Sequence, residues 1–293
     1  MCATCGCSGS PGEASTLLLL HDHGHPHEHG HAHDHAHEHG EAHGHVHAPH
    51  GHAHEHGEAH GHTHDEAPPS THARTVQLEQ EILGKNRLIA ERNRGWLQGR
   101  NVFAVNLMSS PGSGKTTLLE RTVRDLGKSV AIAVIEGDQE TRLDAERIRS
   151  TGARVVQINT GTGCHLDAEM LRHALLELTP AIGSLLFVEN VGNLVCPALF
   201  DLGEGARAVL ASTTEGEDKP LKYPHMFRAA DVILLNKVDL LPHLHFDVDR
   251  FIAHVRLVNP SANVLSVSAT TGEGLEAWYR WLTARDVSAR ADR

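Results

Sequence analysis

The sequence predicts an α/β fold in which helices flank a predominantly parallel β-sheet. From residue 102 onward, seven short apolar runs alternate with helical patterns, and the first run leads through a Gly/Ser-rich loop into a helical pattern. Strands that alternate with helices in this way form parallel sheets covered on both faces. Polar motifs follow several of these runs directly. Ligands bind at the carboxyl ends of the strands in such sheets, so we expect the motifs to form one site.

The expected strands cover residues 102–108, 130–135, 154–158, 184–188, 207–212, 231–236 and 263–267. Helical patterns cover residues 116–126, 141–150, 166–178, 221–229, 246–258 and 274–285. These elements form a predicted α/β domain at 101–293, preceded by a lead-in helix at 74–100. The lead-in helix is predicted from about Val76 to Gln98, with a stripe that we expect to pack on the domain or on a second subunit. The stripe consists of Leu78, Ile82, Ile89 and Trp96.

Residues 1–73 differ in composition from the rest of the chain. They carry ten acidic residues and no Lys or Arg, and so account for −10 of the net charge of −11. The remaining residues are nearly neutral without a basic cluster, which argues against nucleic-acid binding. No stretch approaches the ~18 apolar residues of a membrane helix, and no signal peptide opens the chain. Five cysteines, odd in number and clustered, are unlike a disulfide framework, so we expect a reducing cytoplasm.

The first segment, residues 1–20, begins MCATCGC and places the thiols of Cys2, Cys5 and Cys7 close together. Thiolates bind borderline and soft cations, and Gly6 permits the sharp turn that would aim Cys5 and Cys7 at one ion. The N-terminal amine or a backbone amide could complete a square-planar Ni²⁺ site. A CxxC redox pair is the rival interpretation, but no thioredoxin-like βαβ pattern surrounds it.

A histidine-rich tract follows at 21–73, with 20 histidines between residues 21 and 64. The segment 35–45 is repeated identically at 52–62. The tract has no apolar set to bury, so we expect it to be disordered without metal. Much of the imidazole is neutral at pH 7 and would bind Ni²⁺, Cu²⁺ or Zn²⁺. A solvated linker whose repeats arose by slippage is the alternative.

The run SSPGSGKTT at 109–117 is a predicted phosphate-binding loop between a strand and a helix. Its glycines would let backbone N–H groups curl around phosphate oxygens, and the helix N-terminus adds partial positive charge. Lys115 would contact the β- and γ-phosphates, and Thr116 would bind Mg²⁺. Ser109 replaces the first Gly of the motif, and an ordinary Gly/Ser turn is the alternative. The predicted nucleotide-binding residues here are Gly112, Ser113, Gly114, Lys115, Thr116 and Thr117.

The run NKVD at 236–239 closes an apolar run and indicates the base. The carboxylate of Asp239 can accept hydrogen bonds from guanine N1–H and the N2 amino group. Adenine lacks this donor pair and would leave a buried carboxylate unmatched, so we expect GTP rather than ATP. A plain surface turn is the alternative. The predicted base-side residues are Asn236, Lys237 and Asp239, together with Ser268 and Ala269 of a segment that looks like the GTPase element contacting guanine O6.

Two carboxylates, Asp138 and Glu189, follow the predicted strands 130–135 and 184–188. Either could hold Mg²⁺ through water together with Thr116. Asp138 could also orient the attacking water, so Lys115 and Asp138 are the predicted catalytic residues. Each carboxylate could instead be a cap or a loop residue.

Cys164, His165 and Cys196 lie in two loops that each follow a predicted strand, so they can converge on the nucleotide face. Two sulfur ligands and one nitrogen ligand with an open fourth position suit Zn²⁺ or Ni²⁺. From the residues alone, buried unreactive cysteines are the favoured interpretation.

Eight runs together resemble one known family. They are MCATCGC, SSPGSGKTTLLE, IEGDQETRLDAERI, NTGTGCHLDAEM, FVENVGNLVCP, TEGEDKPLKYPHMF, LLNKVDLLP and SATTGEGLE. The chain resembles the HypB family of SIMIBI-class P-loop GTPases, which serve nickel insertion into [NiFe] hydrogenase. The resemblance covers residues 1–7 and essentially all of 75–285. The histidine-rich tract resembles family variants that also store nickel.

The resemblance implies a P-loop GTPase that converts GTP to GDP and phosphate with Mg²⁺ and forms a GTP-dependent homodimer. It implies nickel at Cys2, Cys5 and Cys7, and nickel or zinc at Cys164, His165 and Cys196. It also implies a HypA-type zinc protein as partner and the [NiFe] hydrogenase large-subunit precursor as recipient. One alternative is a nickel or zinc buffer with a vestigial G domain, against which the intact motifs argue. Another is a urease-type chaperone GTPase, which would not be expected to carry the N-terminal MCxxCGC.

Overall fold

The computed structural model describes residues 71–138, 143–161 and 163–284, with side chains from residue 77 onward. Cys2, Cys5 and Cys7 lie outside the described residues, as do residues 21–70 of the histidine-rich tract. Metal binding by both segments therefore stays a prediction.

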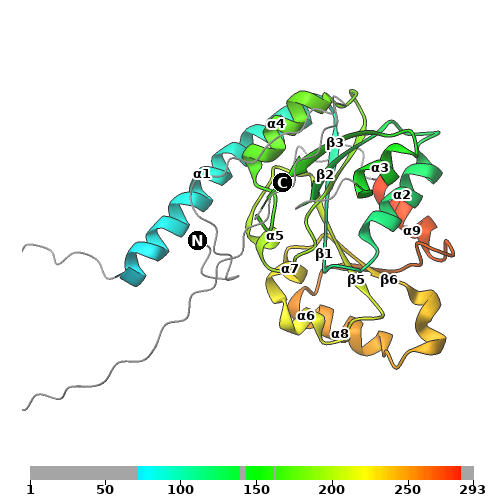
Figure 1. The fold of residues 1–293 in the computed structure, drawn as a ribbon. Helices are drawn as coiled ribbons and strands as arrows, with labels where there is room; N and C mark the ends of the chain where they lie inside the picture. The colour runs from blue at the N-terminus through cyan, green and yellow to red at the C-terminus, as the bar shows by residue number, and fades with distance from the viewer. Residues whose placement is uncertain (1–70, 139–142, 162, 285–293) are drawn as a thin grey trace, which may run out of the picture. The chain divides into compact units, whose positions relative to one another are not determined.

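The seven predicted strands form one sheet in the order β3-β2-β4-β1-β5-β6-β7, and every pair in it is parallel (Figure 1). The predicted fold class is thereby confirmed. The strands are β1 (Phe103–Ser109), β2 (Ile132–Asp138), β3 (Arg154–Asn159), β4 (Leu185–Glu189), β5 (Ala206–Ser212), β6 (Val232–Asn236) and β7 (Asn263–Ser266).

Helices cover both faces of the sheet because each strand points alternate apolar side chains to opposite sides (Figure 1). On one face lie α2 (Lys115–Leu126), α3 (Leu143–Arg149) and α9 (Leu275–Thr283), whose buried side chains share one core with the sheet. The other face carries α4 (Ala168–Leu178), α7 (Pro224–Arg228) and α8 (Val248–Val258). Both faces of the sheet are therefore covered by helices, and the motifs lie at the carboxyl ends of its strands.

Some predicted bounds differ for identifiable reasons. Strand β2 continues to Asp138, because Glu136, Gly137 and Asp138 still pair with β3. The predicted helix at 221–229 is divided into α6 (Lys219–Lys222) and α7. Pro224 causes the break, since proline lacks an N–H and disfavours the helical conformation of the residue before it. Two short helices were not predicted: α5 (Cys196–Leu199) and the 3₁₀ helix η1 (Val238–His243).

The lead-in helix α1 (Thr71–Gly99) is present, but of the predicted stripe Trp96 packs against the core while its N-terminal half does not. Leu78 and Ile82 are exposed, while Asn86, Ala90, Asn93 and Leu97 are buried. Apolar spacing missed this face because two of its four residues are asparagines.

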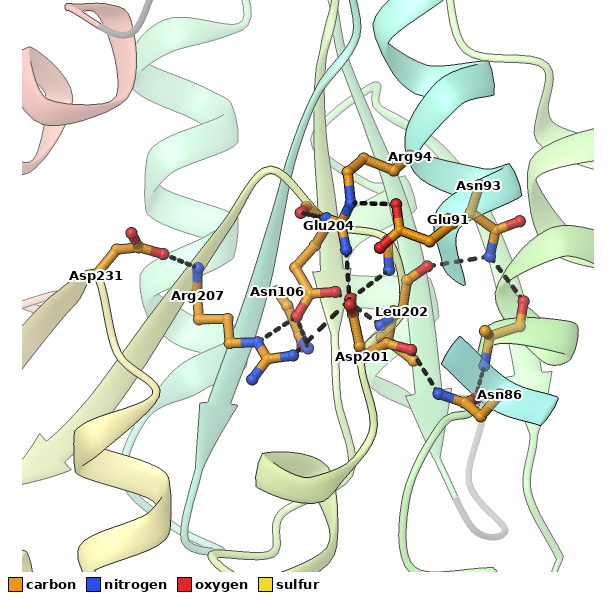
Figure 2. A network of polar contacts seen from close by, with 12 residues as sticks. Asn86, Glu91, Asn93, Arg94, Asn106, Asp201, Leu202, Glu204, Arg207 and Asp231 are labelled. Atoms are coloured by element: carbon orange, nitrogen blue, oxygen red, sulfur yellow. Dashed lines mark hydrogen bonds and ion pairs between the residues drawn. The ribbon is translucent and has the colours of Figure 1, made fainter. Parts of the chain in front are cut away.

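Amide hydrogen bonds explain why this polar face is buried (Figure 2). Asn93 Nδ2 donates to the carbonyl oxygens of Ala168 and Leu202, at 2.8 and 3.0 Å. Asn86 donates to the carbonyl oxygen of Asp201 at 2.7 Å and accepts from the N–H of Ala168 at 2.8 Å. Buried backbone groups need such partners, so α1 is fixed to α4 and to the loop before β5.

Candidate functional site

A pocket of about 570 Å³ opens at the carboxyl ends of β1, β2 and β4. The phosphate-binding loop forms one wall, and the ends of β2 and β4 form the other. Its lining consists of residues 109–117, 136–138 and 191–192, with Asp144, Arg147, Glu189 and Lys237. The structure thus brings together the predicted phosphate-binding residues and both predicted magnesium carboxylates.

The phosphate-binding loop needs two of its glycines for backbone reasons. Gly112 and Gly114 have φ of 73° and 94°, in the left-handed region that favours glycine. At Gly114 a Cβ would also lie only 2.6 Å from Asn236 Nδ2. Ser109 is the last residue of β1 and does not have a positive φ, so the first motif position does not require glycine here.

Lys115 and Thr116 converge on one carboxylate. Lys115 Nζ lies 3.0 Å from Glu189 Oε1, and the Thr116 hydroxyl donates to the same oxygen at 2.7 Å. The hydroxyl oxygen of Thr116 keeps its lone pairs, which are the atoms that a cation would bind. Glu189 Oε2 is buried and has no hydrogen-bond partner among the described residues. The donor set therefore fits Mg²⁺, which prefers oxygen ligands.

Glu136 is a site residue that the sequence analysis missed. It lies beside Glu189 in the register of β2 and β4, is 2% exposed, and lines the pocket. Burial raises the pKa of Glu136 to about 8, and the negative charges of Glu189 and Asp138 add to the shift, while Lys115 opposes it. The sequence did contain a signal for it, since Glu136 is a charged residue that directly follows the apolar run 130–135.

The NKVD segment contacts both the phosphate-binding loop and the Ser268–Ala269 segment. Asn236 Nδ2 donates to the carbonyl oxygen of Ser113 at 2.9 Å, and Asn236 Oδ1 accepts from the N–H of Ala269 at 3.1 Å. Lys237 Nζ donates to the carbonyl oxygen of Gly112 at 2.7 Å. One asparagine therefore connects the phosphate-binding loop with the Ser268–Ala269 segment.

Asp239 lies in the first turn of η1, two residues beyond Lys237. Its Oδ1 is buried without a hydrogen-bond partner among the described residues. A buried carboxylate oxygen without a partner is costly, and the paired N–H donors of guanine are the groups that would satisfy it. The local geometry therefore fits the predicted base preference.

The predicted metal cluster also comes together. The ligand atoms of Cys164, His165 and Cys196 all lie within 4.8 Å of one another. The two Sγ atoms are 2.8 Å apart, and Cys164 Sγ is 3.5 Å from His165 Nδ1. Burial lowers the pKa of His165, with Asp167 opposing the shift, which favours the neutral ligating form at pH 7. Phe200 packs on the imidazole, with ring centroids 3.9 Å apart.

The loop after β4 joins the pocket to this cluster, because it starts at Glu189 and leads to Cys196 at the start of α5. Asn190 is the second residue that the sequence analysis missed. Its Oδ1 accepts from the N–H groups of Leu166 and Val191, at 3.2 and 3.0 Å, and its Nδ2 donates to Asn106 Oδ1 at 3.3 Å. Leu166 directly follows His165, so one buried side chain holds both loops.

Comparisons with known proteins decide the family. A sequence profile described as CobW/HypB/UreG, nucleotide-binding domain, matches residues 103–266. The hydrogenase maturation factor HypB of Rhizobium leguminosarum bv. viciae is 59% identical over 222 residues, which cover 76% of this chain and 73% of that protein. The chain belongs to the HypB family. HypB of Escherichia coli K12 is 56% identical over 216 residues, 74% of each chain.

Two crystal structures of HypB proteins resemble the structure. HypB from Archaeoglobus fulgidus is 42% identical with a TM-score of 0.64, covering 69% of this chain and 98% of that chain. HypB from Helicobacter pylori in complex with nickel is 37% identical with a TM-score of 0.66, covering 70% and 96%. The P-loop GTPase fold and the predicted HypB membership are confirmed. None of the helices in the described residues has both the length and the apolarity to cross a membrane.

Proposed function

We propose that the chain is a GTP-hydrolysing nickel metallochaperone that delivers nickel to the [NiFe] hydrogenase large-subunit precursor. The observation that carries this proposal is the single loop after β4. It begins with Glu189, which binds Lys115 and Thr116, and leads to Cys196 in the metal cluster. A change at the phosphate end of such a loop can bias the metal end, as in other nucleotide switches.

GTP is the proposed nucleotide because Asp239 holds a buried oxygen that guanine would satisfy. Asn236, Lys237, Ser268 and Ala269 would form the rest of the base side. Lys115 would stabilise the charge on the terminal phosphate, and Asp138 would orient the attacking water. Mg²⁺ bound with Thr116, Asp138 and Glu189 would neutralise negative charge on the β- and γ-phosphates.

Nickel is the proposed cargo, and Cys164, His165 and Cys196 would bind it, or zinc, within the G domain. Two thiol sulfurs and a neutral imidazole suit either ion. The nickel complex of the Helicobacter pylori relative supports nickel. We further propose that Cys2, Cys5 and Cys7 bind nickel, and that the histidine-rich tract stores it.

The proposed setting is a reducing cytoplasm, where the thiols stay available as ligands. A GTP-dependent homodimer would change its geometry on hydrolysis. A HypA-type zinc protein would help to deliver nickel to the precursor. Nucleic acid and membrane have no part in this scheme.

Nickel transfer to the purified large-subunit precursor tests the proposal. Full-length chain loaded with nickel is mixed with precursor and the HypA-type protein, in GTP, GDP or a non-hydrolysable GTP analogue. We expect faster transfer with GTP than with either control, and loss of that advantage in Lys115→Ala. Nickel transfer at one rate in all three nucleotides would contradict delivery and favour a nickel buffer. Transfer to an apo-urease system only would favour the urease-type alternative.

A further inference from the structure

The parallel register of β2 and β4 places two carboxylates side by side at the edge of the pocket. Glu136 and Glu189 are Cα partners in this register, and each is 2% exposed. Each also has a buried Oε2 without a hydrogen-bond partner among the described residues. Neighbouring strands lie only about 4.8 Å apart, so the two side chains share one small volume.

Burying two adjacent carboxylates is unfavourable unless positive charge compensates them. Lys115 is the cation that the structure places there, and its Nζ binds Glu189 Oε1 at 3.0 Å. A side chain with only a packing role would not need this charge, since Gln has the same shape without it.

Compensation can come from the ion that the nucleotide brings. Glu136 lines the same pocket as Thr116, Asp138 and Glu189, the proposed Mg²⁺ residues. Mg²⁺ keeps several of its waters in protein sites and binds few carboxylates directly. A further carboxylate beside such a site can therefore accept hydrogen bonds from the waters of the ion.

We infer that the carboxylate of Glu136 is a fourth group of the magnesium site, beside those of Thr116, Asp138 and Glu189. It positions the hydrated ion by accepting hydrogen bonds from its waters. The inference rests on the proposed GTP and Mg²⁺ site and deepens it. Glu136 acts as a charged acceptor in this role. A neutral Glu136 that only donates a hydrogen bond would behave differently, and Glu136→Gln separates the two because Gln is neutral and keeps a donor.

The test is the Mg²⁺ dependence of nucleotide binding by the full-length chain. A fluorescent non-hydrolysable GTP analogue is titrated at increasing Mg²⁺ in buffer freed of nickel and zinc. We expect Glu136→Gln to need about 10- to 100-fold more Mg²⁺ than the wild type, the usual effect of losing a partner of a metal site. Its nucleotide affinity without Mg²⁺ should not fall. Glu276→Gln, which changes an exposed carboxylate on α9, should match the wild type.

Thermal unfolding of the metal-free and nucleotide-free chains provides a second readout. Glu136→Gln should melt at or above the wild-type Tm, since it removes buried charge repulsion, and Mg²⁺ with nucleotide should stabilise it less. An unchanged Mg²⁺ requirement in Glu136→Gln overturns the inference. If that variant does not fold, Glu136→Ala decides, because it also removes the charge. Its Mg²⁺ requirement should rise about 10- to 100-fold as well, and an unchanged requirement overturns the inference. A wild type whose nucleotide binding ignores Mg²⁺ would instead overturn the proposed magnesium site itself.

Discussion

Asn190 accepts a hydrogen bond from the backbone N–H of Leu166, with 3.2 Å between Oδ1 and N. Leu166 follows the metal-cluster residues Cys164 and His165, whereas Asn190 follows Glu189 of the nucleotide pocket. The contact is fully buried, and Asn190 has 0% exposure. It directly connects the loop after β3 with the loop after β4, in addition to the contact between the two cysteine sulfurs.

Asn190→Ala should weaken the coupling between metal and nucleotide. If the two sites are linked, metal affinity at Cys164, His165 and Cys196 should differ between GDP and a GTP analogue by about 1–3 kcal/mol, or 5- to 150-fold. The variant should reduce this difference while both ligands still bind. Calorimetric titration with nickel and zinc measures this difference in affinity. The titration uses a chain that lacks residues 1–70, because metal binding by these residues would mask the signal.

Asn193→Ala is the matched control for this experiment. Asn193 lies in the same loop, but within the part of the chain that the structure describes its Oδ1 accepts only from the N–H of Val195, at 2.8 Å. Equal coupling in Asn190→Ala and Asn193→Ala would show that the Leu166 contact does not transmit the effect.

Asp239→Asn should lose the preference for GTP. An amide would present a donor where the guanine donors need an acceptor, so we expect kcat/KM for GTP to fall by about 100-fold or more, as when a buried hydrogen-bonding group is mismatched. Turnover of xanthosine triphosphate should rise in comparison. Asp249→Asn, an exposed change in the first turn of α8, serves as the control. GTP kinetics that do not change would refute the base assignment.

Deletion of residues 21–64 should separate storage from delivery. The segment holds 20 of the 27 histidines, so most bound nickel per chain should be lost, as measured by elemental analysis. The rate of GTP hydrolysis should remain that of the full chain, because the residues of the pocket and of the metal cluster lie between 109 and 239, outside the deleted segment. A hydrogenase maturation defect that added nickel does not rescue would contradict the storage role.

Asn93→Ala should loosen the attachment of α1 (Figure 2). The change leaves the buried carbonyl groups of Ala168 and Leu202 without this donor, at a cost of about 1–3 kcal/mol in the free energy of unfolding. For a domain of this size each kcal/mol lowers Tm by about 2–4 °C. Gln98→Ala, an exposed change on the same helix, should leave Tm unchanged. Equal Tm values for both variants would refute the anchoring role of the asparagine.

The sequence predicted the strands and the motifs at their ends well, because both leave local signals. Apolar runs define buried strands, and the positive φ of Gly112 and Gly114 requires the glycines that identify the loop. Asp138, Glu189 and Cys196 could be placed at one edge because parallel strands share their carboxyl ends.

Contacts between distant segments were not predictable in the same way. The packed face of α1 depends on carbonyl groups more than 70 residues away, such as that of Ala168, which no periodicity reveals. Glu136 and Asn190 are important through their neighbours in space, Glu189 and Leu166. Their residue types become unusual only once burial is known.

Gly192 brings the loop after β4 close to the phosphate-binding loop. A Cβ at this position would lie 3.2 Å from the backbone of Pro111, so a side chain here would push the two loops apart by a few tenths of an ångström. A substitution of Gly192 would therefore change the spacing between the phosphate-binding loop and the loop that leads to Cys196.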